Sequence, residues 1–188
     1  MSGNFNLTTI SFPIKCMSPK SLLQRVPDIQ KCFSFYLNYA ASVKDPVERM
    51  RAVITCTIAF LWKNSSFEKP LNPILGETYQ AVTADGGKMY CEQTCHHPPR
   101  SSFLIEGPDN KYKVFGWNEY SVKAYLNSAV CTPSGHKTVV FEDGQTIKFN
   151  NSTDTFYNTV MGTLYHWVHG KIEFRDPKNE IYAWYNIG

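Results

Sequence analysis

The sequence predicts an α+β fold, with short helices in the first third of the chain followed by an antiparallel meander of strands. Within residues 16–64, apolar side chains recur at the three- and four-residue spacing of helices. From Phe67 the apolar period changes to two, and turn signals interrupt it at short intervals. Aromatic residues make up 14% of the chain, which suits a large β surface. We therefore expect a single domain over residues 1–188, whose sheet occupies 65–188.

The first helices are predicted from their start signals. Residues 1–15 are polar and lack helical periodicity, so we expect a terminal tail there. Ser18-Pro19 predicts a helix start, because serine is a good N-cap and proline is tolerated in the first turn. That helix is expected to end at Pro27. Asp28 can cap a second helix, whose apolar residues keep helical spacing.

A third helix has the strongest start signal in the chain. Asp45 can act as the N-cap, Pro46 fits the first helical position, and Glu48 is placed to complete a capping box. The apolar side chains that follow form one stripe, which we expect to pack on the sheet as core: Val47, Met50, Ile54, Ile58 and Leu61.

Short strands and frequent turns fill the rest of the chain. Strands are expected near Thr78–Val82, Met89–Cys95, Ser101–Glu106, Lys113–Gly116, Tyr120–Leu126, Thr138–Phe141, Thr146–Phe149, Val160–His166, Lys171–Phe174 and Tyr182–Ile187. Turns are expected at residues 85–87, 108–110, 143–144, 169–170 and 177–179. Short connections between consecutive strands make the sheet antiparallel.

Composition excludes several classes of protein. A net charge of +3, evenly spread, argues against a nucleic-acid partner. The six cysteines follow no dense spacing and no signal peptide precedes them, so we expect reduced thiols and a cytoplasmic protein. The longest apolar-leaning run, Ala52 to Trp62, is well short of the ~20 residues that span a bilayer. Any membrane contact is therefore expected to be peripheral.

Chemically specific side chains are densest in the octet Glu92-Gln93-Thr94-Cys95-His96-His97-Pro98-Pro99. Prolines interrupt ladder pairing and push the preceding residue away from helical geometry, so the strand should break at the histidines. Neighbours on a regular strand point to opposite faces. The two imidazoles can therefore converge on one ligand only where the strand stops being regular.

The octet resembles the fingerprint EQVSHHPP of the oxysterol-binding protein family, with six of its eight residues identical. Residues 69–79 resemble the family's KPLNPLLGETY segment, and residues 45–50 resemble its DPVERM segment. The resemblance implies a lipid-transfer domain, an incomplete antiparallel barrel around a tunnel for a sterol or another lipid. It also implies a polar mouth that binds phosphatidylinositol 4-phosphate, with residues 1–15 as a short lid.

The same resemblance assigns a headgroup site. Lys69 matches the family's phosphate-binding lysine, and the loop after it can offer the N–H of Leu71 and the amide of Asn72. The imidazoles of His96 and His97 add two donors. The rest of the fingerprint is interpreted as support for the sheet: Glu92, Gln93, Pro98 and Pro99. Without the flanking motifs, a solvated lysine and a structural histidine pair would be the simpler interpretations.

Other chemistries fit these residue types less well. Zinc sites need separated pairs of ligands that converge, whereas four candidates crowd one extended stretch: Cys91, Cys95, His96 and His97. His166 and His169, which flank an expected turn, lack a second pair. Adjacent residues on a strand cannot act together as cysteine nucleophile and histidine base. We expect no metal site, no cofactor and no enzymatic activity.

The last expected strand, Tyr182–Ile187, is rich in aromatic residues and would leave one edge unpaired. Because the resemblance implies that family domains continue further, the chain is expected to be C-terminally truncated, with a partner protein, a second copy or further residues covering that edge. Two functions follow. The first is non-enzymatic binding and transfer of a sterol or phosphatidylinositol 4-phosphate; the alternative is a half-domain that serves as a structural or adaptor subunit.

Overall fold

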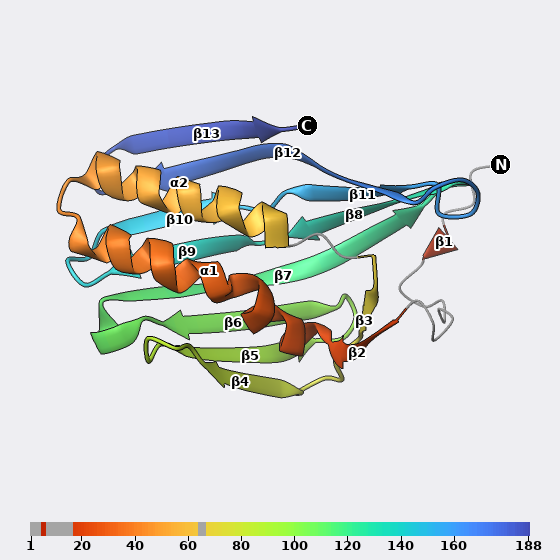
Figure 1. The fold of residues 1–188 in the computed structure, drawn as a ribbon, viewed down its shortest axis with the longest axis horizontal. Helices are drawn as coiled ribbons and strands as arrows, with labels where there is room; N and C mark the ends of the chain where they lie inside the picture. The colour runs from red at the N-terminus through yellow and green to blue at the C-terminus, as the bar shows by residue number, and fades with distance from the viewer. Residues whose placement is uncertain (1–4, 7–16, 64–66) are drawn as a thin grey trace.

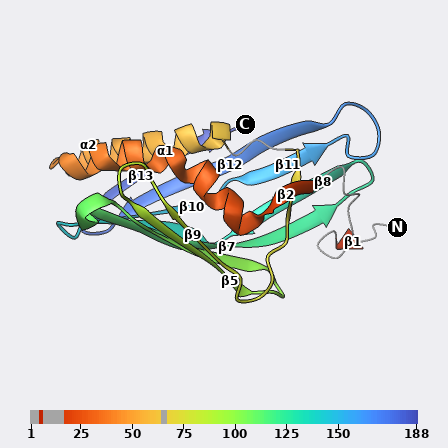
Figure 2. The same ribbon diagram turned by 60° about the horizontal axis from the view of Figure 1, so that its bottom comes forward.

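Two helices lie side by side across one face of a large curved sheet (Figure 1). The computed structural model describes residues 5–6, 17–63 and 67–188. Helix α1 spans Leu22–Ser42 and helix α2 spans Pro46–Lys63. Figure 2 shows the sheet bending beneath the pair of helices, so that its concave side receives them. The expected α+β class, with helices before the sheet, is confirmed.

The strands follow the helices along the chain, apart from two short ones that precede them. They are β1 (Phe5–Asn6), β2 (Met17–Ser21), β3 (Lys69–Leu71), β4 (Thr78–Val82), β5 (Lys88–Cys95), β6 (Arg100–Glu106), β7 (Tyr112–Ala124), β8 (Ser128–Ser134), β9 (His136–Phe141), β10 (Thr146–Asn150), β11 (Thr153–Tyr157), β12 (Tyr165–Asp176) and β13 (Ile181–Ile187). A 3₁₀ turn at Pro108–Asn110 joins β6 to β7.

The large sheet is antiparallel and ring-like without closing as a barrel. Its main path runs β4-β5-β6-β7-β8-β11-β12-β10-β9, and β9 pairs again with β7. The two long strands each change partner along their length. β7 pairs with β9 through residues 112–116 and with β8 through residues 119–124. β12 likewise pairs with β11 at one end and with β10 at the other. The expected incomplete barrel is confirmed.

The core lies between the two helices and the concave face of the sheet. Side chains alternate along the strands, so that in β5 and β6 every second residue faces the helices. The most deeply buried apolar residues include Leu23, Phe33, Leu37, Met50, Val53, Met89, Ile105, Val114, Val139, Ile147 and Phe174. This burial of two amphipathic helices on one sheet face fixes which side of each strand is inside.

Helix α1 begins later than Ser18-Pro19, which the sequence predicts as a start. Both of those residues lie in β2, which pairs in parallel with β3. The N-cap is Ser21, whose hydroxyl accepts from the N–H of Gln24 at 3.4 Å. The Gln24 side chain accepts in return from the N–H of Ser21 at 2.9 Å, which completes a capping box. The reciprocal hydrogen bonds of Ser21 and Gln24 therefore set the start of the helix, in place of Ser18-Pro19.

The predicted break at Pro27 is wrong, because α1 runs through it to Ser42. Asp28 therefore lies inside the helix and does not cap a second one. An interior proline removes one hydrogen bond and costs roughly 3 kcal/mol. Burial of Leu23 on one side of the proline and of Phe33 and Leu37 on the other outweighs that cost.

Helix α2 begins where it is expected to. The N–H of Glu48 donates to Asp45 Oδ1 at 2.8 Å, which confirms Asp45 as the N-cap. The expected apolar stripe is partly wrong: Val47 and Ile58 are exposed, and Met50 is buried. The buried face is rotated toward a different set: Arg49, Ala52, Val53, Cys56 and Thr57. Two of these, Arg49 and Thr57, are polar and are satisfied by hydrogen bonds to other residues, which hydropathy along the sequence cannot reveal.

Asp45→Ala is expected to lower the free energy of unfolding by ~0.5–2 kcal/mol, because the orphan N–H of Glu48 in the first turn loses its acceptor. Urea unfolding, followed by circular dichroism, measures the change. Glu142→Ala, an exposed carboxylate outside the helices, is the matched control and should leave the midpoint unchanged. An unchanged midpoint in Asp45→Ala as well would show that the cap contributes nothing.

Several strand predictions need correction. The expected strands at residues 113–116 and 120–126 are one continuous strand, β7. β8 and β11 are missed, because their sequences alternate weakly. The strand expected at Val160–His166 is mostly a loop, and the turn expected at residues 169–170 lies inside β12. Gly170, at a φ of +120°, lets β12 bend where it exchanges one partner strand for another.

Three expectations concern the chain as a whole. The tail or lid at residues 1–15 lies outside the described residues except for β1, which pairs with β7 at Lys123 and Ala124. Among the cysteines whose side chains the structure describes, Cys91, Cys95 and Cys131 are free thiols. In the described part of the chain, neither helix is long and apolar enough to cross a membrane.

Candidate functional site

The loop between β3 and β4 is fastened to the end of β5. The N–H of Gly76 donates to the carbonyl oxygen of Gln93, and the N–H of Gln93 donates to that of Glu77, each at 3.0 Å. The Glu77 carboxylate closes the loop by accepting from the N–H of Ile74 at 3.1 Å. Gly76 adopts a φ of +79°, which favours glycine at this turn. The loop that follows Lys69 is thus held against the strand that leads to the histidines.

Gln93 secures this arrangement from inside the fold. Its side chain is almost fully buried, and both ends of its amide are satisfied. Ser101 Oγ donates to Gln93 Oε1 at 2.5 Å, and Gln93 Nε2 donates to the carbonyl oxygen of Cys95 at 3.0 Å. The second bond holds the residue immediately before His96. Gln93 therefore holds the end of β5 in place from inside the fold.

The two histidines lie side by side in an exposed turn. β5 ends at Cys95, and residues 96–99 form the turn into β6. The ring centroids of His96 and His97 are 4.7 Å apart, with the rings edge to face. The His97–Pro98 peptide bond is cis. As the sequence predicts, the strand stops at the histidines, and both imidazoles are exposed and adjacent.

Lys69 and Asn72 form a second pair. Lys69 Nζ donates to Asn72 Oδ1 at 3.2 Å. Partial burial lowers the pKa of Lys69, because desolvation disfavours its charged form. An anion beside the ammonium group would favour the charged form again. Leu71, the last residue of β3, is opposite Ser21 in the parallel ladder, which fixes the backbone between the two side chains.

These two pairs lie toward the same end of the molecule. Figure 1 places β3 and the turn between β5 and β6 at one end of the sheet, connected by the fastened loop. The remaining fingerprint residues have lesser roles. Glu92 and Pro98 are exposed, and the carbonyl oxygen of Pro99 accepts from the N–H of Tyr120 at 3.3 Å. The arrangement thus places one ammonium group, two imidazoles and one side-chain amide toward the same end of the sheet.

Sequence reasoning missed Arg100, which follows the fingerprint directly. Its guanidinium donates to Glu119 Oε2 through Nη2 at 2.6 Å and through Nε at 3.0 Å. The same group lies 4.6 Å from the ring centroid of Trp117, within the range of a cation–π contact. Arg100, the first residue of β6, therefore ties the start of that strand to Glu119 and Trp117 of β7. The sequence feature that could have identified Arg100 is its position directly after Pro99.

Zinc binding and nucleophilic catalysis by cysteine have no supporting geometry among the described residues. His166 pairs with Asp154 at 2.8 Å and His169 with Thr155 Oγ1 at 2.8 Å, so both histidines are engaged inside β12. Burial raises the pKa of the Cys91 thiol to about 11, which disfavours a nucleophilic thiolate. Within residues 17–63 and 67–188, no three potential metal-binding side chains come together.

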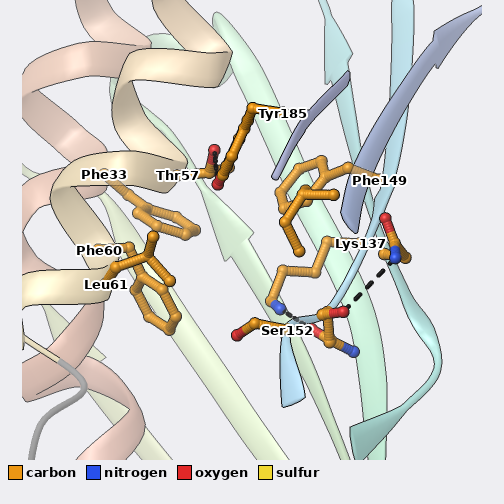
Figure 3. Close-up of a pocket in the computed structure, with 11 residues that line it drawn as sticks. Phe33, Thr57, Phe60, Leu61, Lys137, Phe149, Ser152 and Tyr185 are labelled. Atoms are coloured by element: carbon orange, nitrogen blue, oxygen red, sulfur yellow. Dashed lines mark hydrogen bonds between the residues drawn. The ribbon is translucent and has the colours of Figure 1, made fainter. Parts of the chain in front are cut away.

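A small cavity lies between the helices and the sheet (Figure 3). It encloses about 30 Å³, which is room for a couple of water molecules. Ligand pockets commonly measure roughly 300–1,000 Å³. The walls combine aromatic side chains with one cation: Phe33, Phe60, Phe149, Tyr185 and Lys137. No pattern along the chain singles out Lys137, because its burial depends on the helices that cover β9.

Comparison with known proteins places the chain in a family. The family model described as oxysterol-binding protein matches residues 3–186. The chain belongs to the oxysterol-binding protein family. Oxysterol-binding protein 9 of Dictyostelium discoideum is 34% identical over 175 residues, covering 93% of this chain and 41% of that protein. Oxysterol-binding protein-related protein 1 of Homo sapiens is 32% identical over 177 residues, covering 92% and 18%. The chain thus spans less than half the length of these family members.

Solved structures of the family share the fold. The Osh1 ORD domain in complex with ergosterol has a TM-score of 0.83 at 24% identity, covering 92% of this chain and 42% of that one. The Osh3 ORD in complex with PI(4)P from Saccharomyces cerevisiae has a TM-score of 0.78 at 23% identity, covering 90% and 46%. The resemblance read from the fingerprint is confirmed at the level of family and fold.

Proposed function

We propose that this chain binds the headgroup of phosphatidylinositol 4-phosphate and takes part in non-enzymatic lipid binding and transfer. The observation that carries the proposal is the fastened loop, which holds Lys69 and Asn72 at the end of the sheet where His96 and His97 share an exposed turn. Phosphate oxygens accept strong hydrogen bonds from cationic and amide donors. The family, and the lipid complexes of Osh3 and Osh1, support this function.

Replacing both His96 and His97 by alanine is expected to weaken binding to vesicles that contain phosphatidylinositol 4-phosphate. The variant loses at least one charge-assisted hydrogen bond, worth roughly 1.5–3 kcal/mol, or about ten- to a hundredfold in affinity. Vesicle co-sedimentation measures the loss, with phosphatidylinositol vesicles as the reference. Binding should also weaken as salt is added, because salt screens the attraction between the cationic site and the phosphate.

Matched variants separate the site from a general loss of charge. His136→Ala removes an exposed histidine from β9, and Lys148→Ala removes an exposed lysine from β10. Neither should change vesicle binding, whereas Lys69→Ala should weaken it as the histidine variant does. Equal binding by the wild type and the double histidine variant would remove the headgroup site.

A structural or adaptor role is the second candidate. It is favoured by the small cavity under the helices, whose volume of about 30 Å³ is far below that of a pocket for a sterol. In such a role β13, which among the described strands pairs with β12, offers its other edge to a partner strand. Titration with a fluorescent sterol distinguishes the candidates, because saturable binding would contradict a purely structural role.

A further inference from the structure

Two neighbouring hairpin tips expose large apolar side chains to solvent. The tip between β7 and β8 presents Leu126, which is 94% exposed, and the loop between β11 and β12 presents Val160 and Met161, each 78% exposed. With two further exposed residues, Tyr125 and Leu164, they form what we call the tip surface. Figures 1 and 2 both show these connections together at one end of the sheet.

Asn127 holds the tip surface in one arrangement. Its Oδ1 accepts from the N–H groups of Val160 and Met161, each at 3.0 Å, and its Nδ2 donates to the carbonyl oxygen of Met161 at 3.0 Å. Its own carbonyl oxygen accepts from the N–H of Thr159 at 3.3 Å. One side chain thus ties the two hairpins together. The exposed apolar residues are presented by a defined scaffold.

Aromatic side chains form a belt directly behind the aliphatic tip. Tyr157 and Tyr165 are cross-strand partners at the ends of β11 and β12, with ring centroids 6.1 Å apart. Trp167, two residues further from the tip, stacks at 6.3 Å from Tyr157. Aliphatic groups outermost, with tyrosine and tryptophan behind them, match the layers of a membrane interface, where amphipathic rings settle at headgroup level.

The charges around the tips suit an anionic surface. Residues 120–134 and 155–170 contain one lysine, Lys123, and no aspartate or glutamate. Lys123 is exposed next to the first tip. A carboxylate at this depth would oppose contact with anionic lipid, and a lysine there favours it.

The tip surface also extends beyond the candidate headgroup site in the same direction. Figure 1 shows the turn after β5 and strand β3 toward the end of the sheet where the tips project. The loop after β3 exposes two more aliphatic side chains, Ile74 and Leu75. A surface that places a lipid headgroup site and apolar tips at one end of a protein suits a bilayer better than a single protein partner.

We propose that the tip surface inserts into the interfacial layer of an anionic phospholipid bilayer and docks the chain there. The proposal rests on the proposed function for the orientation of the docked chain. The contact between the tips and lipid is inferred separately, from the exposed apolar side chains, the aromatic belt behind them and the absence of carboxylates around them. We thus assign the tip surface to a bilayer. A result showing that it is a protein interface would contradict the proposal.

The test compares tip variants with a matched variant at the other end of the sheet. Leu126→Asp and Met161→Asp place a carboxylate at the tips, and Val82→Asp places one on an aliphatic position of β4 that is 73% exposed. Vesicles of phosphatidylcholine and phosphatidylserine are the probe, and inositol 1,4-bisphosphate in solution probes the headgroup site without a bilayer. The tip variants should lose vesicle affinity by roughly tenfold or more, while Val82→Asp keeps it.

Each outcome decides the proposal. Loss of vesicle binding in both tip variants, with unchanged affinity for inositol 1,4-bisphosphate and an unchanged unfolding midpoint, supports docking through the tips. Wild-type vesicle binding in the tip variants overturns it. It is equally overturned if the wild type sediments as a dimer that Met161→Asp dissociates, while vesicle binding stays the same. Tip-dependent vesicle binding by a wild type that fails to bind inositol 1,4-bisphosphate would keep the docking surface and refute the headgroup site.

Discussion

Replacing Arg49 by alanine is expected to lower the free energy of unfolding by about 3–5 kcal/mol, because several acceptors lose a donor at roughly 1–3 kcal/mol for each buried one. The Arg49 side chain is 4% exposed. Its guanidinium donates to the carbonyl oxygens of Ala40 and Val43, to Asp143 Oδ2 at 2.5 Å and to Gln145 Oε1 at 2.8 Å. Alanine would leave the buried Gln145 Oε1 without its donor and would remove donors from both carbonyl oxygens.

The network explains why this loss should be large. Asp143 is half exposed, so its ion pair with Arg49 contributes little, and most of the cost comes from the buried carbonyls and Gln145. Gln145 extends the network by donating to Asp176 Oδ2 at 2.7 Å. The guanidinium also lies 4.6 Å from the ring centroid of Phe141. Arg49 thereby joins the end of α1, the start of α2 and the β9–β10 hairpin.

Urea unfolding measures the effect, and two further variants test the explanation. Arg51→Ala removes an exposed arginine one turn away in the helix and should change stability by less than about 0.5 kcal/mol. Arg49→Lys keeps the charge but cannot make the same fork of hydrogen bonds, so it should fall between the two. A wild-type midpoint in Arg49→Ala would show that the carbonyls find other donors.

Replacing Lys137 by methionine is expected to raise the free energy of unfolding at neutral pH by about 3 kcal/mol, the value of a pKa lowered by two to three units. Lys137 is 6% exposed, and burial lowers its pKa to about 8. Its Nζ donates to Asn151 Oδ1 and lies 5.7 Å from the ring centroid of Phe60 and 5.8 Å from that of Phe149. Among the described residues, no carboxylate pairs with this ammonium group.

The expected gain depends on pH in a defined direction. Between pH 8 and the ordinary lysine pKa of 10.5, the unfolded chain binds more protons at residue 137 than the folded chain does. The lysine therefore destabilises the fold fully below pH 8, and this penalty disappears as pH rises toward 10.5. The advantage of the methionine variant should shrink over the same interval.

Comparing two variants isolates this contribution. Thiols such as Cys131, whose pKa burial raises to about 12, make stability fall at high pH, but they are the same in the wild type and in Lys137→Met. Lys148→Met, at an exposed position of β10, should leave stability within about 0.5 kcal/mol of the wild type. A gain that is absent at pH 7, or that stays constant up to pH 10.5, would contradict a buried charged lysine.

The sequence by itself determined the family, the fold class and the local signals that act over a few residues. Asp45 caps α2 because its neighbours Pro46 and Glu48 suit a helix start in any context. The strand through Cys95 stops at the histidines because two prolines follow them. These effects depend on backbone geometry near each residue, so they can be predicted without knowing what packs nearby.

Only the tertiary structure decided which local signals prevail. Pro27 lies within a helix, because burial on both sides of it outweighs one missing hydrogen bond. β7 and β12 are long strands that change partners, and a strand's partners lie far away in the sequence. The burial of Arg49 and Lys137, and the junction of two hairpins at Asn127, arise where distant segments meet. Their energies depend on contacts and desolvation, which a periodic pattern along the chain does not contain.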